Sequence, residues 1–315
     1  MSLSRRRVAA CLSLILSGAA SAAQARTRPL VVASFSILAD LVAEVAGDGV
    51  DTRALVGPDV DAHGYAPTPS DARAVAAADL VVVNGLGFDA WAEKLAKAAG
   101  FRGRLAVASR GVATLRLQAG AHGHGHGHGP GHAHGHGRGG ADPHVWQDPL
   151  RTRSLIMTLA EELAAVDPAG AEGFRARAAA YGRRLEELDR WILDELAPIP
   201  RERRRIFTSH DAFGYFEARY GVDFRAPRGV NMDGEPSAAD IGRIVREIRR
   251  EKARIVFLEN VSSPRLIEQI ARESGARMGG RLYTDALSPP GGPAATYLDL
   301  MRHNVARLRD AMLAE

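Results

Sequence analysis

Histidine is the residue type with the most evident chemistry in this chain, and its eleven copies fall into two groups. Seven lie in a tract of histidine and glycine over residues 120–140, and these are His122, His124, His126, His128, His132, His134 and His136. The other four are His63, His144, His210 and His303. Because imidazole is the commonest metal-ligating side chain in proteins, metal binding is the chemistry that these residues favour.

Three of the four scattered histidines stand where loops would present them. His63 lies in a segment with two prolines and a glycine, which prevent regular structure and stiffen the loop. His144 follows a proline and comes two residues before Trp146, an apolar anchor. His210 lies between a strand pattern and a helix pattern, at the kind of strand end where open α/β sheets bind ligands. We therefore predict that His63, His144 and His210 are metal ligands.

Each of these three histidines has an aspartate close to it in the sequence, namely Asp61, Asp142 and Asp211. A hydrogen-bond acceptor usually fixes the orientation of a metal-ligating imidazole, so these aspartates are candidates for that supporting role. Solvation by water is the alternative for each of them. His303 lies within the predicted final helix, where we expect a surface or packing role.

The first 25 residues have the features of a cleavable export signal. Arg5, Arg6 and Arg7 precede a short apolar stretch over residues 8–16, and residues 23–25 offer a small-residue cleavage site. Removal of this segment lowers the formal net charge from +4 to +1, which gives no reason to expect a nucleic-acid partner. The only cysteine, Cys11, lies within it, so the ligands of any metal must be nitrogen and oxygen. We expect a periplasmic protein.

Short apolar runs alternate with helical patterns through the rest of the chain, and this alternation predicts parallel sheets covered by helices. Strands are expected at residues 30–33, 52–56, 80–83, 105–108, 206–207, 255–258 and 278–283. The histidine-rich tract at 120–140 has almost no apolar bulk, so we expect a mobile loop there. The fold class is therefore α/β.

A long amphipathic pattern separates two such series. Apolar residues recur at alternating steps of four and three, and they are Phe174, Ala178, Tyr181, Leu185, Leu188, Ile192 and Leu196. At ~1.5 Å per residue, a helix of about 30 residues is roughly 45 Å long, enough to run along two lobes. We predict an N-terminal lobe at 26–165, a linking helix at 166–198 and a C-terminal lobe at 199–315.

Several segments resemble the metal-binding proteins of bacterial ABC transporters for zinc and manganese, in particular the zinc-specific periplasmic type typified by ZnuA and AztC. The matching segments are residues 61–71 around His63, 142–146 around His144, 208–216 around His210, 235–237 and 284–287. The histidine-rich insertion before His144 is itself typical of the zinc-binding members. The resemblance extends over nearly the whole mature chain.

The resemblance implies two α/β lobes joined by a rigid long helix, with the metal in the cleft between them. It implies that His63 and His144 come from the first lobe, and His210 and Asp285 from the second. A plain turn-capping role is the alternative for Asp285. Three imidazoles and one carboxylate suit tetrahedral zinc, whereas manganese prefers more oxygen ligands.

We accordingly expect the zinc-binding component of an ABC-type importer, which delivers Zn²⁺ to a membrane permease. We expect it to be a monomer. Loading by a periplasmic zinc chaperone is an option. The histidine-rich tract would collect zinc weakly or sense its supply. A manganese-binding transporter component and a metal buffer without a transporter are the alternatives in this class. A zinc hydrolase is disfavoured because no His-Glu-x-x-His motif is present, and Glu235 and Glu259 are expected in structural or solvated roles rather than as bases.

Overall fold

The computed structural model describes residues 28–116, 140–226, 237–251, 253–262 and 264–314. The predicted export signal, nearly all of the histidine-rich tract, and residues 235–236 lie outside the described residues. Within them, no helix is both long enough and apolar enough to cross a membrane.

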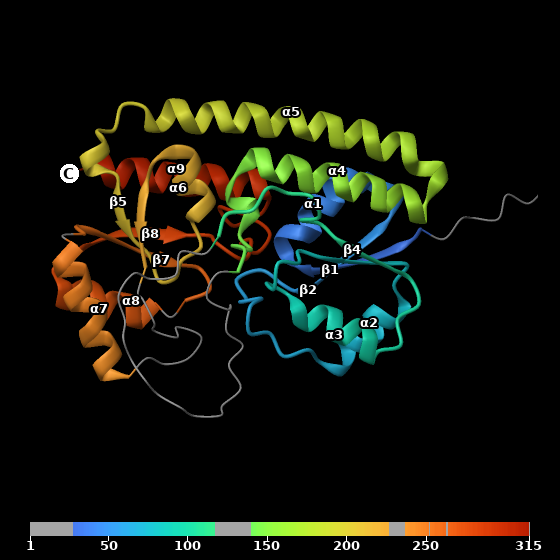
Figure 1. Ribbon diagram of the computed structural model, residues 1–315, viewed down its shortest axis with the longest axis horizontal. Helices are drawn as coiled ribbons and strands as arrows, with labels where there is room; N and C mark the ends of the chain where they lie inside the picture. The colour runs from blue at the N-terminus through green and yellow to red at the C-terminus, as the bar shows by residue number, and fades with distance from the viewer. Residues whose placement is uncertain (1–27, 117–139, 227–236, 252, 263, 315) are drawn as a thin grey trace, which may run out of the picture.

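The first lobe is built on a four-stranded parallel sheet with the order β2-β1-β3-β4. Its strands are β1 (Leu30–Phe35), β2 (Asp51–Val56), β3 (Leu80–Val83) and β4 (Arg104–Val107). Helices α1 (Ser36–Ala46) and α4 (Pro149–Val166) lie on one face, and α2 (Pro69–Ala77) and α3 (Ala90–Ala98) on the other (Figure 1). Alternate side chains of a strand point to opposite faces of the sheet, so Val31 packs on the α1 side and Val32 on the α2 side.

The second lobe repeats this plan with the strand order β6-β5-β7-β8, again all parallel. Its strands are β5 (Arg205–Phe207), β6 (Asp223–Arg225), β7 (Ile255–Glu259) and β8 (Arg277–Leu282). Its helices are α6 (Gly214–Tyr220), α7 (Ala238–Glu251), α8 (Pro264–Ser274) and α9 (Tyr297–Leu313). Two parallel sheets flanked by helices confirm the predicted fold class, whereas the pattern of apolar runs did not reveal β6.

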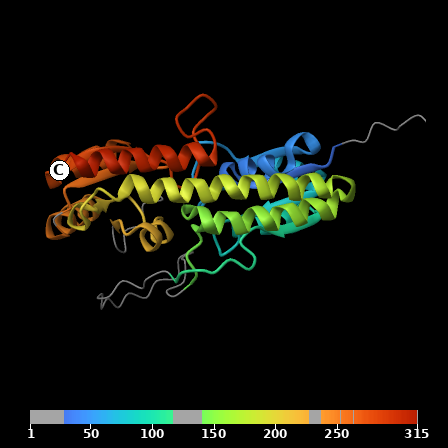
Figure 2. The same cartoon turned by 90° about the horizontal axis from the view of Figure 1, so that it is seen from above.

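Helix α5 (Ala171–Leu196) runs along the length of the molecule and lies over both lobes (Figure 2). It has 26 residues, and the whole predicted apolar stripe from Phe174 to Leu196 is buried. It begins later than the predicted residue 166 because a 3₁₀ turn, Pro168–Gly170, precedes it. The Asp167 side chain accepts a bond from the Gly170 N–H in that turn (3.3 Å).

The core is continuous beneath α5. α5 contacts α1 in the first lobe and α9 in the second, and one apolar cluster extends from Val31 to Met312 through the α5 stripe. The opposite faces of the two sheets have separate clusters of their own. A shared core on one side therefore makes the lobes resist separation there, which fits a rigid link.

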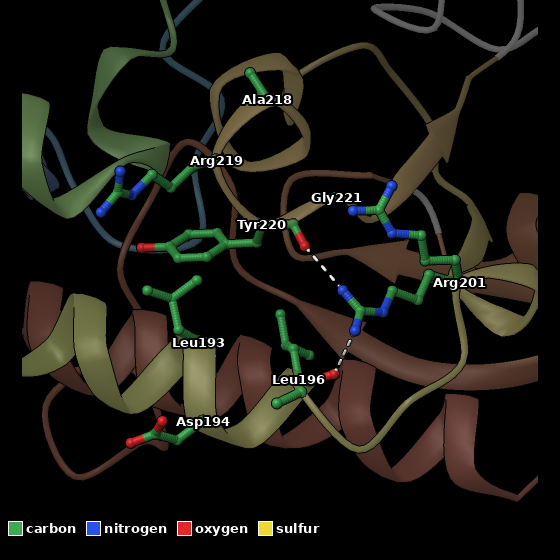
Figure 3. Close-up of a pocket in the computed structure, with 10 residues that line it drawn as sticks. Leu193, Asp194, Leu196, Arg201, Ala218, Arg219, Tyr220 and Gly221 are labelled. Atoms are coloured by element: carbon green, nitrogen blue, oxygen red, sulfur yellow. Dashed lines mark hydrogen bonds between the residues drawn. The ribbon is translucent and has the colours of Figure 1, made fainter.

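A hollow of about 690 Å³ lies where α5 and α6 end, and Leu196 and Tyr220 are on its wall (Figure 3). Arg204 donates to the carbonyls of Leu196 (2.7 Å) and Tyr220 (3.1 Å), so one guanidinium satisfies the last turns of both helices. Arg219 is paired with Asp189. None of the predicted metal ligands lines this hollow, and its arginines serve the fold.

Candidate metal centre

The four residues assigned to the metal come from loops of the two lobes. His63 follows β2, His210 follows β5 and Asp285 follows β8, each at the carboxyl end of a parallel strand. His144 enters directly before the 3₁₀ turn Val145–Gln147 that leads into α4. In the part of the chain that the structure describes, one ligand atom from each of the four lies within 4.8 Å of all the others.

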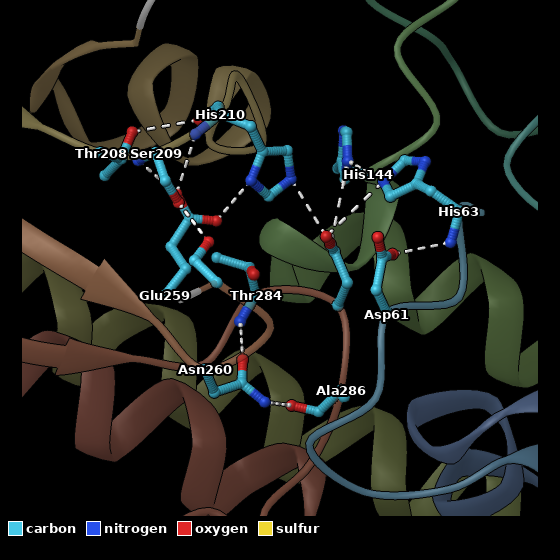
Figure 4. Close-up of polar contacts among 12 residues, drawn as sticks. Asp61, His63, His144, Thr208, Ser209, His210, Glu259, Asn260, Thr284 and Ala286 are labelled. Carbon is cyan, nitrogen blue, oxygen red and sulfur yellow. Dashed lines mark hydrogen bonds and ion pairs between the residues drawn. The ribbon is translucent and has the colours of Figure 1, made fainter. Parts of the chain in front are cut away.

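The ring nitrogens and the carboxylate surround a common centre, and Figure 4 shows the three rings turned toward one another. The Nε2 atoms of His63 and His144 are 3.2 Å apart. Asp285 Oδ2 lies 3.0 Å from His210 Nε2 and 3.5 Å from His63 Nε2. A tetrahedral zinc with bonds of ~2.1 Å holds its ligand atoms about 3.4 Å apart, so the spacing suits such an ion.

His144 is held by the aspartate that the sequence suggested. Asp142 Oδ1 lies 2.8 Å from His144 Nδ1 and also accepts from the His144 backbone N–H at 3.0 Å. Both side chains are buried. This contact leaves Nε2, the other ring nitrogen, directed at the centre, as a metal-ligating tautomer requires.

His210 is held by a residue that the sequence did not suggest for this role. Its Nδ1 lies 2.5 Å from Glu259 Oε2, at the end of β7, whereas Asp211 is exposed. Glu259 Oε1 accepts from the backbone N–H groups of Ser209 (2.7 Å) and His210 (3.0 Å). Glu259 was expected in a structural or solvated role, and its fully buried side chain shows that the role is structural. The one sequence signal for this role of Glu259 is that a charged residue ends an otherwise apolar strand.

His63 is positioned through its backbone and its ring face. Asp61 Oδ1 accepts from the His63 backbone N–H at 2.8 Å, so this aspartate fixes the loop. Trp91 Nε1 donates to the Ala62 carbonyl at 2.7 Å. The His63 ring meets Phe88 edge-on, with centroids 4.3 Å apart. The imidazole therefore stands on an aromatic support, and its side chain is 17% exposed.

His303 is separate from this centre, as the sequence indicated. Its Nε2 lies 3.0 Å from the Arg281 carbonyl, and its ring meets Tyr283 edge-on. Burial lowers its pKa, which keeps the ring neutral at neutral pH. It packs α9 against β8.

The ionisable side chains of the site strongly affect one another's pKa values. Burial alone would raise the pKa of Asp285, but the imidazole of His210 and the neighbouring rings hold it well below its usual range. Burial would lower the pKa of His210, yet Glu259 and Asp285 on either side raise it well above the ordinary value. Apart from the histidine nitrogens, no donor reaches either Asp285 oxygen in the described residues. A buried carboxylate whose only polar neighbours are imidazole nitrogens fits a bound cation.

Comparisons with known proteins agree with this geometry. Residues 31–311 match the model of the family described as zinc-uptake complex component A, periplasmic. The chain belongs to this family. It consists of metal-binding solute-binding proteins of ABC transporters, which act outside the cytoplasm with a membrane permease and an ATPase, and not of enzymes. The hydrolase alternative is thereby set aside.

The relatives differ in the metal for which they are named. A manganese-binding lipoprotein of Halalkalibacterium halodurans is 32% identical, over 87% of this chain and 85% of its own length. An iron-binding protein of Yersinia pestis is 30% identical, over 87% and 83%. The zinc-binding protein TroA of Treponema pallidum is 30% identical over 96% of both chains. The solved TroA structure superposes with a TM-score of 0.78 at 27% identity, over 90% of this chain and 99% of that one.

Proposed function

We propose that this protein is the zinc-binding component of an ABC-type importer, and that it carries Zn²⁺ to the membrane permease. The donor set supports zinc: three imidazoles and one carboxylate lie within 4.8 Å of one another. Zinc accepts four such ligands in a tetrahedron. Manganese is the second candidate because relatives are named for it, but it prefers more oxygen ligands and a higher coordination number.

The four ligands act as two pairs, with His63 and His144 from the first lobe and His210 and Asp285 from the second. A bound ion therefore joins the lobes and stabilises one arrangement of them. We infer that the permease recognises this arrangement. Since the core beneath α5 is continuous, release requires a small loop movement rather than a wide opening. Small-angle scattering of the metal-free and loaded forms should show nearly equal dimensions, and a large change would contradict this mechanism.

Metal identity is tested by competition. The metal-free protein is offered equal amounts of Zn²⁺ and Mn²⁺, and native mass spectrometry with metal analysis identifies the retained ion. We expect one tightly held zinc, and preferential retention of manganese would overturn the proposal. His210→Glu adds an oxygen donor and should shift the preference toward manganese. His303→Ala is the matched control, because His303 lies outside the centre, and it should leave the preference unchanged.

The histidine-rich tract is proposed as an accessory zinc collector. Free imidazoles bind Zn²⁺ weakly and can pass it to a stronger site. Deletion of residues 121–139 should leave the four-ligand site intact and lower the zinc stoichiometry or the loading rate. Unchanged stoichiometry and loading would remove this role.

A further inference from the structure

We propose that Asn260 is the positioning residue of Asp285, and that Asp59 links this positioning to the first lobe. The inference rests on the metal site of the proposed function, but it holds for any divalent cargo. It concerns how the chain places the carboxylate ligand before an ion arrives.

Asp285 needs such help because, among the described residues, only histidine rings offer hydrogen bonds to its carboxylate. Its side chain is 0% exposed. In the described part of the chain, neither carboxylate oxygen receives a hydrogen bond from a group other than the histidine rings. Because no other polar group holds the carboxylate, we infer that the backbone on either side of Asp285 sets its position.

The Asn260 side chain binds the backbone on both sides of Asp285. Its Oδ1 accepts from the Thr284 N–H at 3.2 Å, and its Nδ2 donates to the Ala286 carbonyl at 3.2 Å (Figure 4). The Asn260 backbone N–H donates to the Leu282 carbonyl at 2.9 Å, which extends the β7–β8 pairing toward the ligand. A primary amide carries an acceptor oxygen and a donor NH₂ on separate atoms, so one Asn side chain can make both bonds.

The same amide reaches the first lobe. Asn260 Nδ2 also lies 3.0 Å from Asp59 Oδ1, and the Asp59 backbone N–H donates to the Leu287 carbonyl at 3.0 Å. Asp59 adopts φ +56°, a left-handed conformation that a non-glycine residue rarely adopts. Such a conformation persists where surrounding bonds fix it, and here the fixing bonds cross between the lobes.

Adjacent residues at the end of β7 thus serve both ligands of the second lobe. Glu259 orients the His210 ring, and Asn260 fixes the segment that carries Asp285.

The test compares Asn260→Ala with a matched control, Asn304→Ala. Asn304 also binds both backbone groups of one residue, Tyr283 (2.9 and 2.6 Å). It is buried, whereas Asn260 is partly exposed, and among the described residues it has no bond to Thr284, Asp285 or Ala286. Co²⁺ is used as the probe, because its visible spectrum reports ligand number and geometry. We expect Asn260→Ala to alter the spectrum and to release Co²⁺ to a chelator at least about tenfold faster, the effect typical of losing a residue that orients a ligand.

Asn304→Ala should lower the unfolding temperature while it leaves the spectrum and release rate as in the wild type. Equal spectra and rates for Asn260→Ala and the wild type would overturn the proposal, as would equal effects of the two variants. Hydrogen exchange of the Thr284 amide in metal-free protein is a second readout. Asn260→Ala should accelerate it more than Asn304→Ala, because Asn260 accepts from this N–H directly, whereas Asn304 binds the carbonyl of the same peptide group. Failure of the wild type to take up Co²⁺ would refute the metal site, and the exchange data would still decide the positioning role.

Asp59→Gly tests the link to the first lobe. Glycine adopts φ +56° without strain and retains the backbone bond to Leu287, so only the side-chain bond to Asn260 is removed. We expect release of Co²⁺ to be faster than in the wild type and slower than in Asn260→Ala. A release rate equal to that of the wild type would show that Asn260 acts without the first lobe.

Discussion

The two lobes hold their halves of the metal site by different physical means. In the first lobe, His63 and His144 rest against the aromatic rings of Phe88 and Trp146, whose centroids lie 4.3 and 5.4 Å from theirs. In the second lobe, His210 stands between two fully buried carboxylates, and within the described part of the chain its ring meets only the first-lobe histidines. Aromatic packing therefore supports the first pair in addition to the Asp142 contact, whereas contacts with carboxylates locate His210.

The difference indicates which half needs the cation. Burial of a carboxylate is unfavourable unless an opposite charge or hydrogen bonds compensate it. Asp285 has only imidazoles for compensation, so the second lobe gains more from the ion than the first, whose buried carboxylate at the site, Asp142, already has two donors. Variants of matched position in the two lobes should separate these contributions.

The largest effect on zinc affinity should come from removal of the carboxylate ligand. Asp285→Ala takes away both a ligand and the negative charge that offsets the ion, whereas His63→Ala takes away a partly exposed ring and no carboxylate. We expect Asp285→Ala to weaken zinc binding by more than the ~10–100-fold typical for a residue that only orients a ligand, and by more than His63→Ala does. Isothermal competition with a chelator measures both. A larger loss in His63→Ala would reverse the comparison.

The next largest effect should come from the residues that orient the rings. In Glu259→Gln, Oε1 must keep its bonds from Ser209 and His210, so the amide NH₂ faces His210 Nδ1. That contact favours the tautomer with hydrogen on Nε2, which cannot bind metal. We expect a ~10–100-fold loss of zinc affinity.

Asp142→Asn is the matched variant in the first lobe. There a single oxygen, Oδ1, accepts from both the backbone N–H and Nδ1 of His144. An asparagine oxygen can make both bonds and preserve the tautomer, so the loss should be well below that of Glu259→Gln. Nitrogen-15 chemical shifts of the rings report the tautomers directly, and equal losses of affinity would contradict this reasoning.

Sequence alone predicted both residues of the first pair and one residue of the second. His63, His144 and His210 were recognisable because prolines, glycines and strand ends place them in loops. The α5 stripe was recognisable because helical periodicity is local. Asp285 carries no such signal, since one aspartate in a loop is common, and its assignment depended on resemblance.

The features that were missed depend on contacts between distant residues. Glu259 meets His210 across 49 positions, so neither segment reveals the pair by itself. Asp211 is adjacent to His210 in sequence but exposed in the structure, because neighbouring positions in a loop need not point the same way. Strand β6 has three residues, two of them charged, and only its pairing with β5 makes it a strand. Burial and pairing of this kind are tertiary properties.

A smaller effect on zinc should come from the aromatic support. Phe88→Leu keeps the core filled but removes the ring edge contact with His63, and an aromatic pair contributes about 0.5–1.5 kcal/mol beyond its buried area. We expect a few-fold loss of zinc affinity. Phe224→Leu is the control, because it removes a stacked pair with Phe213 in the second lobe that does not contact a ligand. It should reduce stability only, and an equal loss of affinity would mean that general loosening is responsible.

Substitution of Asp40 should have the smallest effect on zinc affinity and a clear effect on stability. This α1 carboxylate accepts from the Tyr297 N–H at the start of α9 (2.8 Å), so it joins the lobes without touching a ligand. Burial raises its pKa from 3.8 to about 6, and the nearby charges of Glu44 and Asp299 add to the shift while Arg184 opposes it. The folded state therefore binds this proton more tightly than the unfolded state, and stability falls as the pH rises from about 4 through about 6.

Asp40→Asn retains the acceptor oxygen and removes the charge. At pH 8 we expect the variant to be more stable than the wild type by about 2–3 kcal/mol, which is the size of the pKa shift expressed as free energy. At pH 4 most of this difference should vanish, because Asp40 is then protonated in the folded wild type. Urea unfolding of the metal-free protein at the two pH values measures both, and zinc affinity should stay unchanged. If the difference in free energy of unfolding is the same at both pH values, it arises from packing, and the ionisation of Asp40 does not contribute.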